Sequence, residues 1–220
     1  MFRERIEAIE ERILRAVARA GRKRSDITLL AVSKTFPADQ MRQAYEAGLR
    51  EFGENYVQEF AAKKPALADL AGAHFHFIGH LQSNKTAEAS QLFDVIQTVD
   101  SPKIARRLNE GGRDLEVMIE VKLSPEDSKS GVLPEELPAL VDAIQGLDKL
   151  RLTGLMTMPP WNDDAEVARP YFRKLTELAC GHGLGKLSMG MSHDFEVAIE
   201  EGATHIRVGR ALFGPRVRNP

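Results

Sequence analysis

Short apolar or β-branched runs alternate with helical patterns eight times along this chain of 220 residues. The strand-like runs lie at Ile27–Lys34, Glu51–Glu54, His74–His80, Val95–Asp100, Leu115–Leu123, Leu150–Met158, Lys186–Met189 and His205–Gly209. The helical patterns lie at about Ala38–Ala47, Asn55–Ala62, Asn84–Ser90, Pro102–Glu110, Glu135–Ile144, Ala165–His182 and His193–Glu201, with a short turn of helix after Gly209. Because parallel neighbours cannot be connected by hairpins, the alternation predicts parallel strands joined by helical crossovers.

Eight such units favour an α/β fold in the form of a closed (β/α)₈ barrel, with an open doubly wound sheet as the alternative. An amphipathic pattern from Phe2 to Val17, stopped at Gly21, predicts one extra helix before the first strand. No internal repeat, low-complexity tract or Gly/Ser linker divides the sequence. We therefore expect residues 1–220 to form a single domain.

The charge balance and cysteine content limit the classes of partner. Thirty basic and 32 acidic residues give a net charge of −2, and the two signs are interleaved, which argues against nucleic acid or an anionic membrane as the main partner. The single cysteine, Cys180, excludes an intramolecular disulfide and suits a reducing compartment. Since no export signal or membrane-spanning stretch is visible, we expect a cytoplasmic protein in which Cys180 is a buried, unreactive thiol.

Lys34 ends the first predicted strand, where a barrel places functional residues. It shares the period-two face of Leu30 and Val32 and is expected to point into the barrel mouth. A lysine at the rim of an apolar cavity loses solvation, which lowers its pKa and makes the neutral amine a nucleophile toward carbonyl groups. Schiff-base chemistry is one interpretation, and an exposed lysine at a strand end is the other.

Arg207 lies on the last predicted strand. It shares one face with His205, while Ile206 and Val208 take the other, so the apolar pair is expected to face the helices and Arg207 the barrel interior. A buried guanidinium requires an acceptor. A heteroaromatic nitrogen of a ligand and a structural carboxylate remain the two possibilities.

Glycines follow the last two predicted strands. Gly190 and Gly209 each precede a helical segment, and barrels commonly hold phosphate on backbone N–H groups in these loops. Ser192 is expected to begin the first of these helices as its N-cap. Ordinary turn glycines are the alternative, and the segment Gly181–Lys186 is interpreted as a helix end and a turn because it lacks the spacing of a phosphate-binding loop.

Three histidines, at positions 74, 76 and 80, share one strand face. We do not predict a metal site there because no carboxylate cluster accompanies them at ligand spacing. His76 and His80 are better explained as pocket or core residues, and Met156 as pocket lining. Ser188 belongs to the polar end of the seventh strand and is expected at the same mouth.

Six segments, taken together and in order, closely resemble the pyridoxal phosphate homeostasis protein family, whose barrel is related to the N-terminal domain of alanine racemase and has fold type III of the pyridoxal phosphate proteins. The segments are Ala31–Thr35, Phe52–Tyr56, His76–Lys85, Gly154–Met158, Leu187–Ser192 and Arg207–Gly209. The resemblance implies one pyridoxal phosphate cofactor in the barrel mouth.

The resemblance also implies roles for individual residues. Lys34 would form a Schiff base with the cofactor, Arg207 would hydrogen-bond the pyridine nitrogen, and Ser192 with Gly209 and its neighbours would hold the phosphate. Asn55 would lie near the cofactor ring. Family members often have Ser or Thr after the last glycine, whereas this chain has Arg210, whose backbone N–H alone is expected to serve. The complete predicted cofactor site is Lys34, Asn55, His80, Met156, Ser188, Ser192, Arg207, Gly209 and Arg210.

The family resemblance favours a carrier that buffers or delivers pyridoxal phosphate without substantial catalysis. An arginine at the pyridine nitrogen disfavours ring protonation, so the ring is a poor electron sink. The expected partners are the cofactor and, as recipients, apo-enzymes that use it, and we expect a monomer.

Two other hypotheses remain open. An amino-acid racemase tolerates the arginine but requires two opposed bases, one of which comes from a second domain in the similar racemases. Since the sequence ends at Pro220, soon after the last predicted strand, we expect no such domain. An aldolase-type barrel keeps Lys34 but leaves Arg207 without a ring nitrogen.

Overall fold

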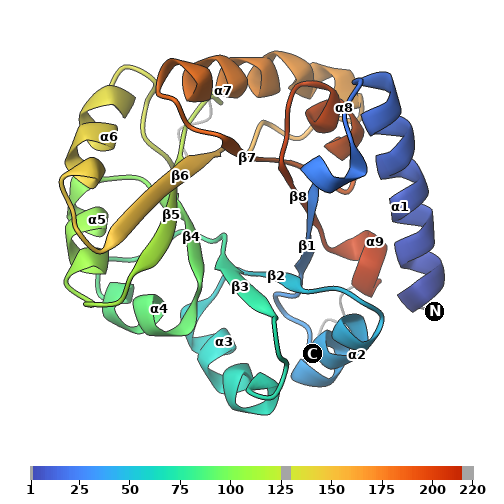
Figure 1. The fold of residues 1–220 in the computed structure, drawn as a ribbon, viewed down its shortest axis with the longest axis horizontal. Coiled ribbons are helices and arrows are strands. Elements are labelled where there is room, and N and C mark those ends of the chain that lie inside the picture. Colours follow the sequence, from blue (N-terminus) through green and yellow to red (C-terminus); the bar gives the residue numbers. More distant parts are fainter. Residues whose placement is uncertain (1, 125–129, 215–220) are drawn as a thin grey trace.

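Eight parallel strands close into a barrel in sequence order, with β8 beside β1, in a computed structural model that describes residues 2–124 and 130–214 (Figure 1). The strands are β1 (Thr28–Val32), β2 (Glu51–Glu54), β3 (His74–Phe77), β4 (Val95–Val99), β5 (Leu115–Glu120), β6 (Leu150–Met156), β7 (Lys186–Met191) and β8 (His205–Val208). The predicted (β/α)₈ barrel is confirmed, and the open sheet was the wrong alternative.

Helices surround the barrel and cover the outer face of its strands (Figure 1). They are α1 (Phe2–Arg19), α2 (Ala38–Glu46), α3 (Val57–Lys63), α4 (Thr86–Leu92), α5 (Pro102–Asn109), α6 (Leu137–Gln145), α7 (Arg169–Gly181), α8 (Phe195–Glu200) and α9 (Arg210–Phe213). Short 3₁₀ turns lie at Arg24–Asp26, Lys64–Leu67 and Ala165–Ala168. None of the helices within residues 2–124 and 130–214 is both long and apolar enough to cross a membrane.

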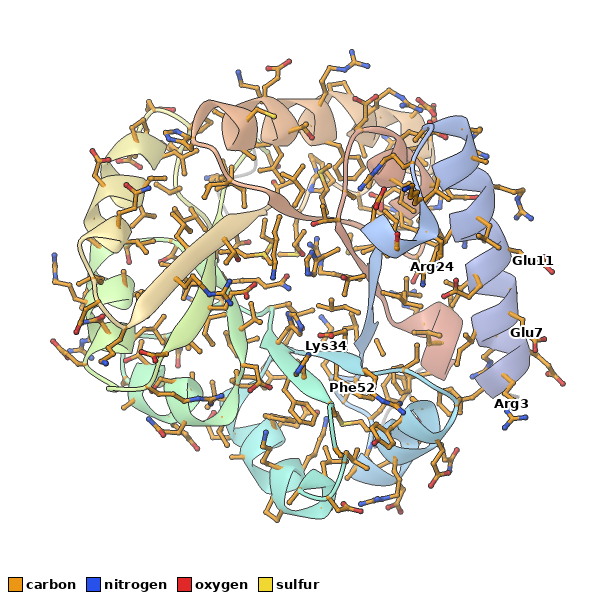
Figure 2. The ribbon with its side chains drawn as sticks, in the orientation of Figure 1. Arg3, Glu7, Glu11, Arg24, Lys34 and Phe52 are labelled. Atoms are coloured by element: carbon orange, nitrogen blue, oxygen red, sulfur yellow. The ribbon has the colours of Figure 1, made fainter. Side chains whose placement is uncertain are left out.

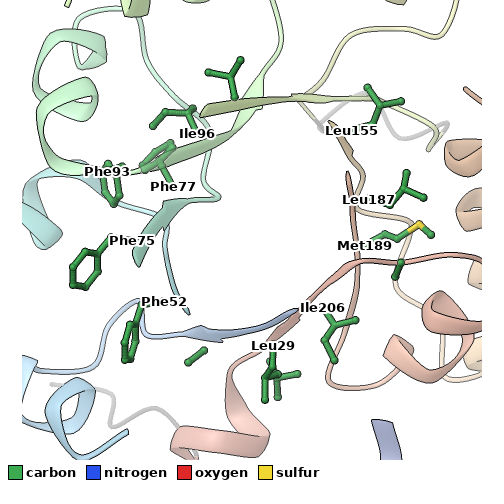
Figure 3. Close-up of a cluster of buried hydrophobic side chains, with 14 of the residues drawn as sticks. Leu29, Phe52, Phe75, Phe77, Phe93, Ile96, Leu155, Leu187, Met189 and Ile206 are labelled. Atoms are coloured by element: carbon green, nitrogen blue, oxygen red, sulfur yellow. The ribbon is translucent and has the colours of Figure 1, made fainter. Parts of the chain in front are cut away.

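The strands have an apolar outer face and a largely polar inner face. Leu29 and Ile206 point outward and join the main core between sheet and helices (Figure 3). Inside the barrel a separate small apolar cluster contains Leu30, Val32 and Ile78. The alternation of side chains along each strand therefore separates a continuous apolar core from an interior that holds buried charged and polar groups.

Helix α1 is the predicted extra helix, and it packs beside α8 and α9 (Figure 1). Its buried residues Ile9, Ile13 and Val17 recur at helical spacing, while Leu14 between them is half exposed. This amphipathic stripe gives α1 a single side on which it can pack.

Several predicted strands were too long at their carboxyl ends. Strand β1 ends at Val32 rather than Lys34, and β3 ends at Phe77 rather than His80. Beyond these points one further backbone hydrogen bond joins each segment to β2, from Ser33 N–H to the Gly53 carbonyl and from Ile78 N–H to the Glu54 carbonyl. Strand β7 is instead longer than predicted, since Met191 still pairs with Arg207 of β8 beyond a register irregularity.

Candidate functional site

Lys34 lies in a turn just beyond the end of β1. The turn begins at Ser33, and Lys34 itself is half-buried, so its side chain belongs neither to the core nor to free solvent. Figure 2 shows this side chain within the ring of strands. The predicted inward parity is supported by Leu30 and Val32, which face the barrel interior, although Lys34 follows the strand rather than ending it.

A set of hydrogen bonds from β2 and α3 holds this turn. The Ser33 hydroxyl donates to Glu54 Oε1 at 2.8 Å, and Lys63 Nζ donates to the Ser33 carbonyl at 3.2 Å. The Thr35 N–H donates to Glu59 at 2.6 Å, and Thr35 has a φ of 69°, which is strained for a β-branched residue. Hydrogen bonds thus hold both neighbours of Lys34, Ser33 and Thr35, in place.

Glu54 anchors this arrangement from a completely buried position. Burial raises the pKa of its carboxyl group, against the opposing charge of Lys63 and hydrogen bonds from Ser33 and Lys63. Lys63 Nζ lies 3.0 Å from Glu54 Oε1 and 2.5 Å from Glu59. Since a buried carboxylate requires a cation nearby, the position of Lys63 is tightly determined.

Arg207 points into the barrel, as predicted, and is only 4% exposed. Its guanidinium donates to Ser188 Oγ at 2.8 Å and to the Thr157 carbonyl at 2.9 Å. In the part of the chain that the structure describes, no carboxylate oxygen lies within ion-pair distance of Arg207. The structural ion pair considered as the alternative is therefore not what holds this arginine.

Two carboxylates influence Arg207 from further away. Burial lowers the pKa of Arg207 to about 10, while the charges of Asp194 and Glu120 oppose the shift, so Arg207 is a cation at neutral pH. Glu120, 3% exposed at the end of β5, has its pKa raised to about 7 by burial, against the charge of Arg207 and with that of Asp100. Arg207 therefore places a positive charge in the barrel interior, and Glu120 is a carboxyl group with a pKa near neutrality.

The loop between β7 and α8 differs from the prediction. Asp194, not Ser192, occupies the N-cap position of α8, which begins at Phe195. Asp194 Oδ1 accepts the Met191 N–H at 2.6 Å, so this N–H is already used. The prediction of Ser192 as N-cap was wrong because the turn takes two further residues before the helix begins.

Gly190 is required for packing. It has a φ of +87°, and a Cβ atom there would lie 2.6 Å from Ala198 Cβ and 2.8 Å from Phe195 Cα. The absence of a side chain lets α8 approach β7 closely. Close packing of α8 on β7 is thus a sufficient reason for glycine at this position.

Gly209 lies where β8 meets the end of β1. A Cβ atom there would be 3.4 Å from the Val32 carbonyl oxygen, two residues before Lys34. Gly209 is the N-cap of α9, and its carbonyl accepts the N–H groups of Leu212 and Phe213. The N–H groups of Arg210 and Ala211, the first two residues of α9, have no acceptor within the helix. The Arg210 side chain itself is exposed.

Asn55 follows β2 directly. Its Oδ1 atom is buried and, among the described residues, accepts no hydrogen bond. Gly79, in the loop after β3, approaches it so closely that a Cβ atom would lie 2.2 Å from the Asn55 carbonyl oxygen. A buried unpaired acceptor at a strand end is a position for a ligand donor or an ordered water.

His80 and Met156 lie in different surroundings. Met156 is completely buried and is paired with Glu120 across the β5–β6 ladder. His80 is an exposed loop residue, 3.0 Å from Ser130 Oγ and 3.8 Å from Asp100 Oδ2. It lines a surface cavity of about 440 Å³ with Gln82, Asn84 and Lys103. His80 is therefore not a core residue.

The structure contradicts the prediction of a buried cysteine, because Cys180 is exposed near the end of α7. Its neighbour Ala179 takes the buried position of that turn instead. In the described residues, no group of three or more His, Cys, Asp or Glu side chains is arranged to hold a metal ion.

Sequence reasoning missed several residues of the site. Gln97, Thr157, Glu120 and Asp194 all contact or influence Arg207 or its partners. The sequence contains a signal for Gln97, because this amide lies between Val95 and Val99 on the strand parity that faces the interior. Position 97 is completely buried, and the polar groups of a buried amide require partners.

Comparisons with known proteins agree with this geometry. Residues 5–217 match the family model described as alanine racemase, N-terminal domain. The pyridoxal phosphate homeostasis protein of Pseudomonas aeruginosa is 48% identical, over 97% of this chain and 95% of that protein.

Solved structures extend the comparison. PipY of Synechococcus elongatus, in a structure with pyridoxal phosphate bound, is 38% identical with a TM-score of 0.84, over 97% of this chain and all of that one. An alanine racemase from Corynebacterium glutamicum shares the fold at 20% identity and a TM-score of 0.67, over 94% of this chain and 60% of the racemase. With nearly full-length similarity at this level, the chain belongs to the pyridoxal phosphate homeostasis protein family, whose barrel is that of the alanine racemase N-terminal domain.

Proposed function

We propose that this protein binds pyridoxal phosphate in the barrel mouth and buffers or delivers it, without substantial catalysis of its own. Relatives at 48% and 44% identity are named pyridoxal phosphate homeostasis proteins, and the similar PipY structure has pyridoxal phosphate bound. These relationships support the same ligand here.

The residues at the mouth fit the chemistry of that ligand. When bound, pyridoxal phosphate supplies an aldehyde that condenses reversibly with a primary amine. Lys34 would provide the amine, and Arg207 would donate a hydrogen bond to the ring nitrogen. The buried Oδ1 of Asn55 has no partner among the described residues and would accept a hydrogen bond from a ring substituent. For the phosphate, the proposed donors are Ser192 and the backbone of Gly209 and Arg210.

The observation that carries the proposal is the state of Arg207. It is buried and cationic, yet its hydrogen-bond partners in the described residues are a hydroxyl and a carbonyl rather than a carboxylate. These two bonds use two of the five N–H donors of a guanidinium. Nitrogen in an aromatic ring is an acceptor that suits the donors left over.

The same arginine argues for storage rather than turnover. A fixed cation beside the ring nitrogen lowers the pKa of that nitrogen, and an unprotonated ring stabilises carbanions poorly. Turnover also requires a placed acid and base, each of which typically contributes about a hundred- to ten-thousand-fold in rate. We propose that the recipients are apo-enzymes that use the cofactor.

Three finer assignments belong to the same proposal. We place the protein in the cytoplasm on the basis of its single, unpaired cysteine. It would act as a monomer, because the proposed cofactor site is built from residues of one chain. His80 and Met156 are proposed as outer and inner lining of the cofactor pocket.

A transfer assay tests the function. Protein loaded with pyridoxal phosphate is expected to show a visible absorbance band and to reactivate an added apo-enzyme as that band declines. L-Alanine supplied to the loaded protein should remain unconverted. Rapid formation of D-alanine, lost in Lys34→Ala, would favour the racemase alternative, and a protein that never acquires the band would refute cofactor binding.

A further inference from the structure

A chain of hydrogen bonds crosses the barrel interior from Arg207 to Glu51. The Arg207 guanidinium lies 2.8 Å from Ser188 Oγ, and Ser188 Oγ lies 2.6 Å from Gln97 Oε1. Gln97 Nε2 is 2.9 Å from His76 Nδ1, and His76 Nε2 is 2.7 Å from Glu51 Oε2. Strands β8, β7, β4, β3 and β2 each contribute one member.

The chemistry of the two ends fixes the direction of every bond. A guanidinium only donates, so Ser188 Oγ must accept from Arg207 and give its own hydrogen to Gln97 Oε1. The amide nitrogen of Gln97 then donates to Nδ1 of His76, which places the imidazole hydrogen on Nε2. That hydrogen points at Glu51.

Glu51 is a suitable acceptor at the far end. Burial alone would raise its pKa, but the hydrogen bonds from His76 and His74 favour the ionised carboxylate, and the pKa is lowered to about 2. The carboxylate is thus ionised and can only accept. Each intermediate group has a single orientation that satisfies both of its neighbours.

The middle of the chain is sealed from water. Ser188 and Gln97 are completely buried, and His76 is 3% exposed. The Glu51 end opens on a cavity of about 860 Å³ at the amino ends of the strands, where His74 and His205 also lie. Because Gln97 is completely buried, water cannot replace a hydrogen-bond partner that Gln97 loses. A change in the hydrogen bonds of Gln97 would therefore alter those of Ser188 and His76.

We propose that Gln97 and His76 are positioning residues that hold Arg207 in place for the ring nitrogen of the cofactor. The proposal rests on the function proposed above. A Gln97 amide rotated by half a turn would offer NH₂ to Ser188 and leave the hydroxyl hydrogen of Ser188 without its acceptor. Arg207 would then lose the fixed acceptor that sets its side-chain geometry.

The first experiment uses the apo-protein and does not depend on the cofactor. Imidazole ¹⁵N spectra of the wild type should show His76 as the neutral form with hydrogen on Nε2. Gln97→Met should move the Nδ1 resonance of His76, while Glu88→Ala, which removes only an exposed ion pair with Lys85, should leave it in place. A wild-type His76 with hydrogen on Nδ1, or doubly protonated, would overturn the proposal.

The second experiment uses the loaded protein. Gln97→Met and the smaller change Ser188→Ala should shift the visible absorbance of bound pyridoxal phosphate and speed its release by roughly three- to tenfold. Glu88→Ala should do neither, and thermal melting verifies that each variant folds. If Gln97→Met and Ser188→Ala both show the absorbance and the release rate of the wild type, the positioning role is refuted. If the wild type does not take up pyridoxal phosphate, the proposed function is refuted instead. The spectra of the apo-protein test the hydrogen-bond chain independently of that result.

Discussion

Lys63 Nζ lies 3.0 Å from Oε1 of Glu54, a carboxylate with no exposed surface, and the same amine donates to the carbonyl of Ser33. The pair therefore joins α3 to the turn that carries Lys34. Glu59 adds a second contact to this turn, through the N–H of Thr35. The turn that carries the proposed nucleophile is therefore held by residues of β2 and α3.

Glu59→Ala should weaken cofactor retention. The substitution removes the acceptor of the Thr35 N–H and releases a backbone held at a φ of 69°. We expect release of pyridoxal phosphate to accelerate roughly three- to tenfold, as measured by transfer to an acceptor apo-enzyme. Glu88→Ala on α4, which removes only an exposed ion pair with Lys85, is the matched control. Equal release rates in the two variants would show that the turn does not need Glu59.

Borohydride reduction of the loaded protein should fix the cofactor to Lys34. Its place at the mouth, two residues beyond β1, motivates the assignment. Peptide mapping by mass spectrometry should find the adduct on the peptide that contains Lys34, and Lys34→Ala should lack the visible band. An adduct confined to Lys63 or Lys186 would remove Lys34 from its proposed role.

Arg207→Gln should shift the absorbance of the bound cofactor and weaken its retention about tenfold, because a charged donor is replaced by a neutral one. Absorbance spectra and equilibrium dialysis measure the two effects. If neither changes, Arg207 has a structural role only.

Glu120→Gln should stabilise the apo-protein at alkaline pH. The pKa of Glu120 rises from 4.5 to about 7 on folding, so the folded state binds more protons than the unfolded state between these values. The contribution of Glu120 to stability is therefore lost as the pH rises through this window and does not return above it. Glutamine cannot ionise, and its advantage should be small at pH 5 and about 1–3 kcal/mol at pH 8.

Thermal or denaturant unfolding at the two pH values measures this difference. Glu135→Gln, at an exposed position before α6, is the control and should show no such pH dependence. A Glu120→Gln variant with the same advantage at pH 5 and pH 8 would contradict titration of Glu120 near neutrality.

The sequence by itself determined the barrel and the direction of its two principal side chains. Alternation of strand and helix patterns is a property of neighbouring residues, and it required parallel pairing. Period-two parity likewise placed Ile206 and Val208 in the outer core and left Arg207 facing inward. These predictions hold because side-chain direction along a strand is set locally.

Only the tertiary structure decided where the strands end, which residue begins α8, and which residues surround Arg207. Asp194 replaces Ser192 at the helix start because it captures the Met191 N–H within a turn whose length depends on the packing of α8 against β7. Cys180 is exposed because Ala179 is the residue that faces the barrel. Gln97 and Ser188 are 91 residues apart, and closure of the barrel alone brings them to 2.6 Å. Contacts of this kind leave no pattern in the local sequence, since they depend on which strands face one another across the barrel interior.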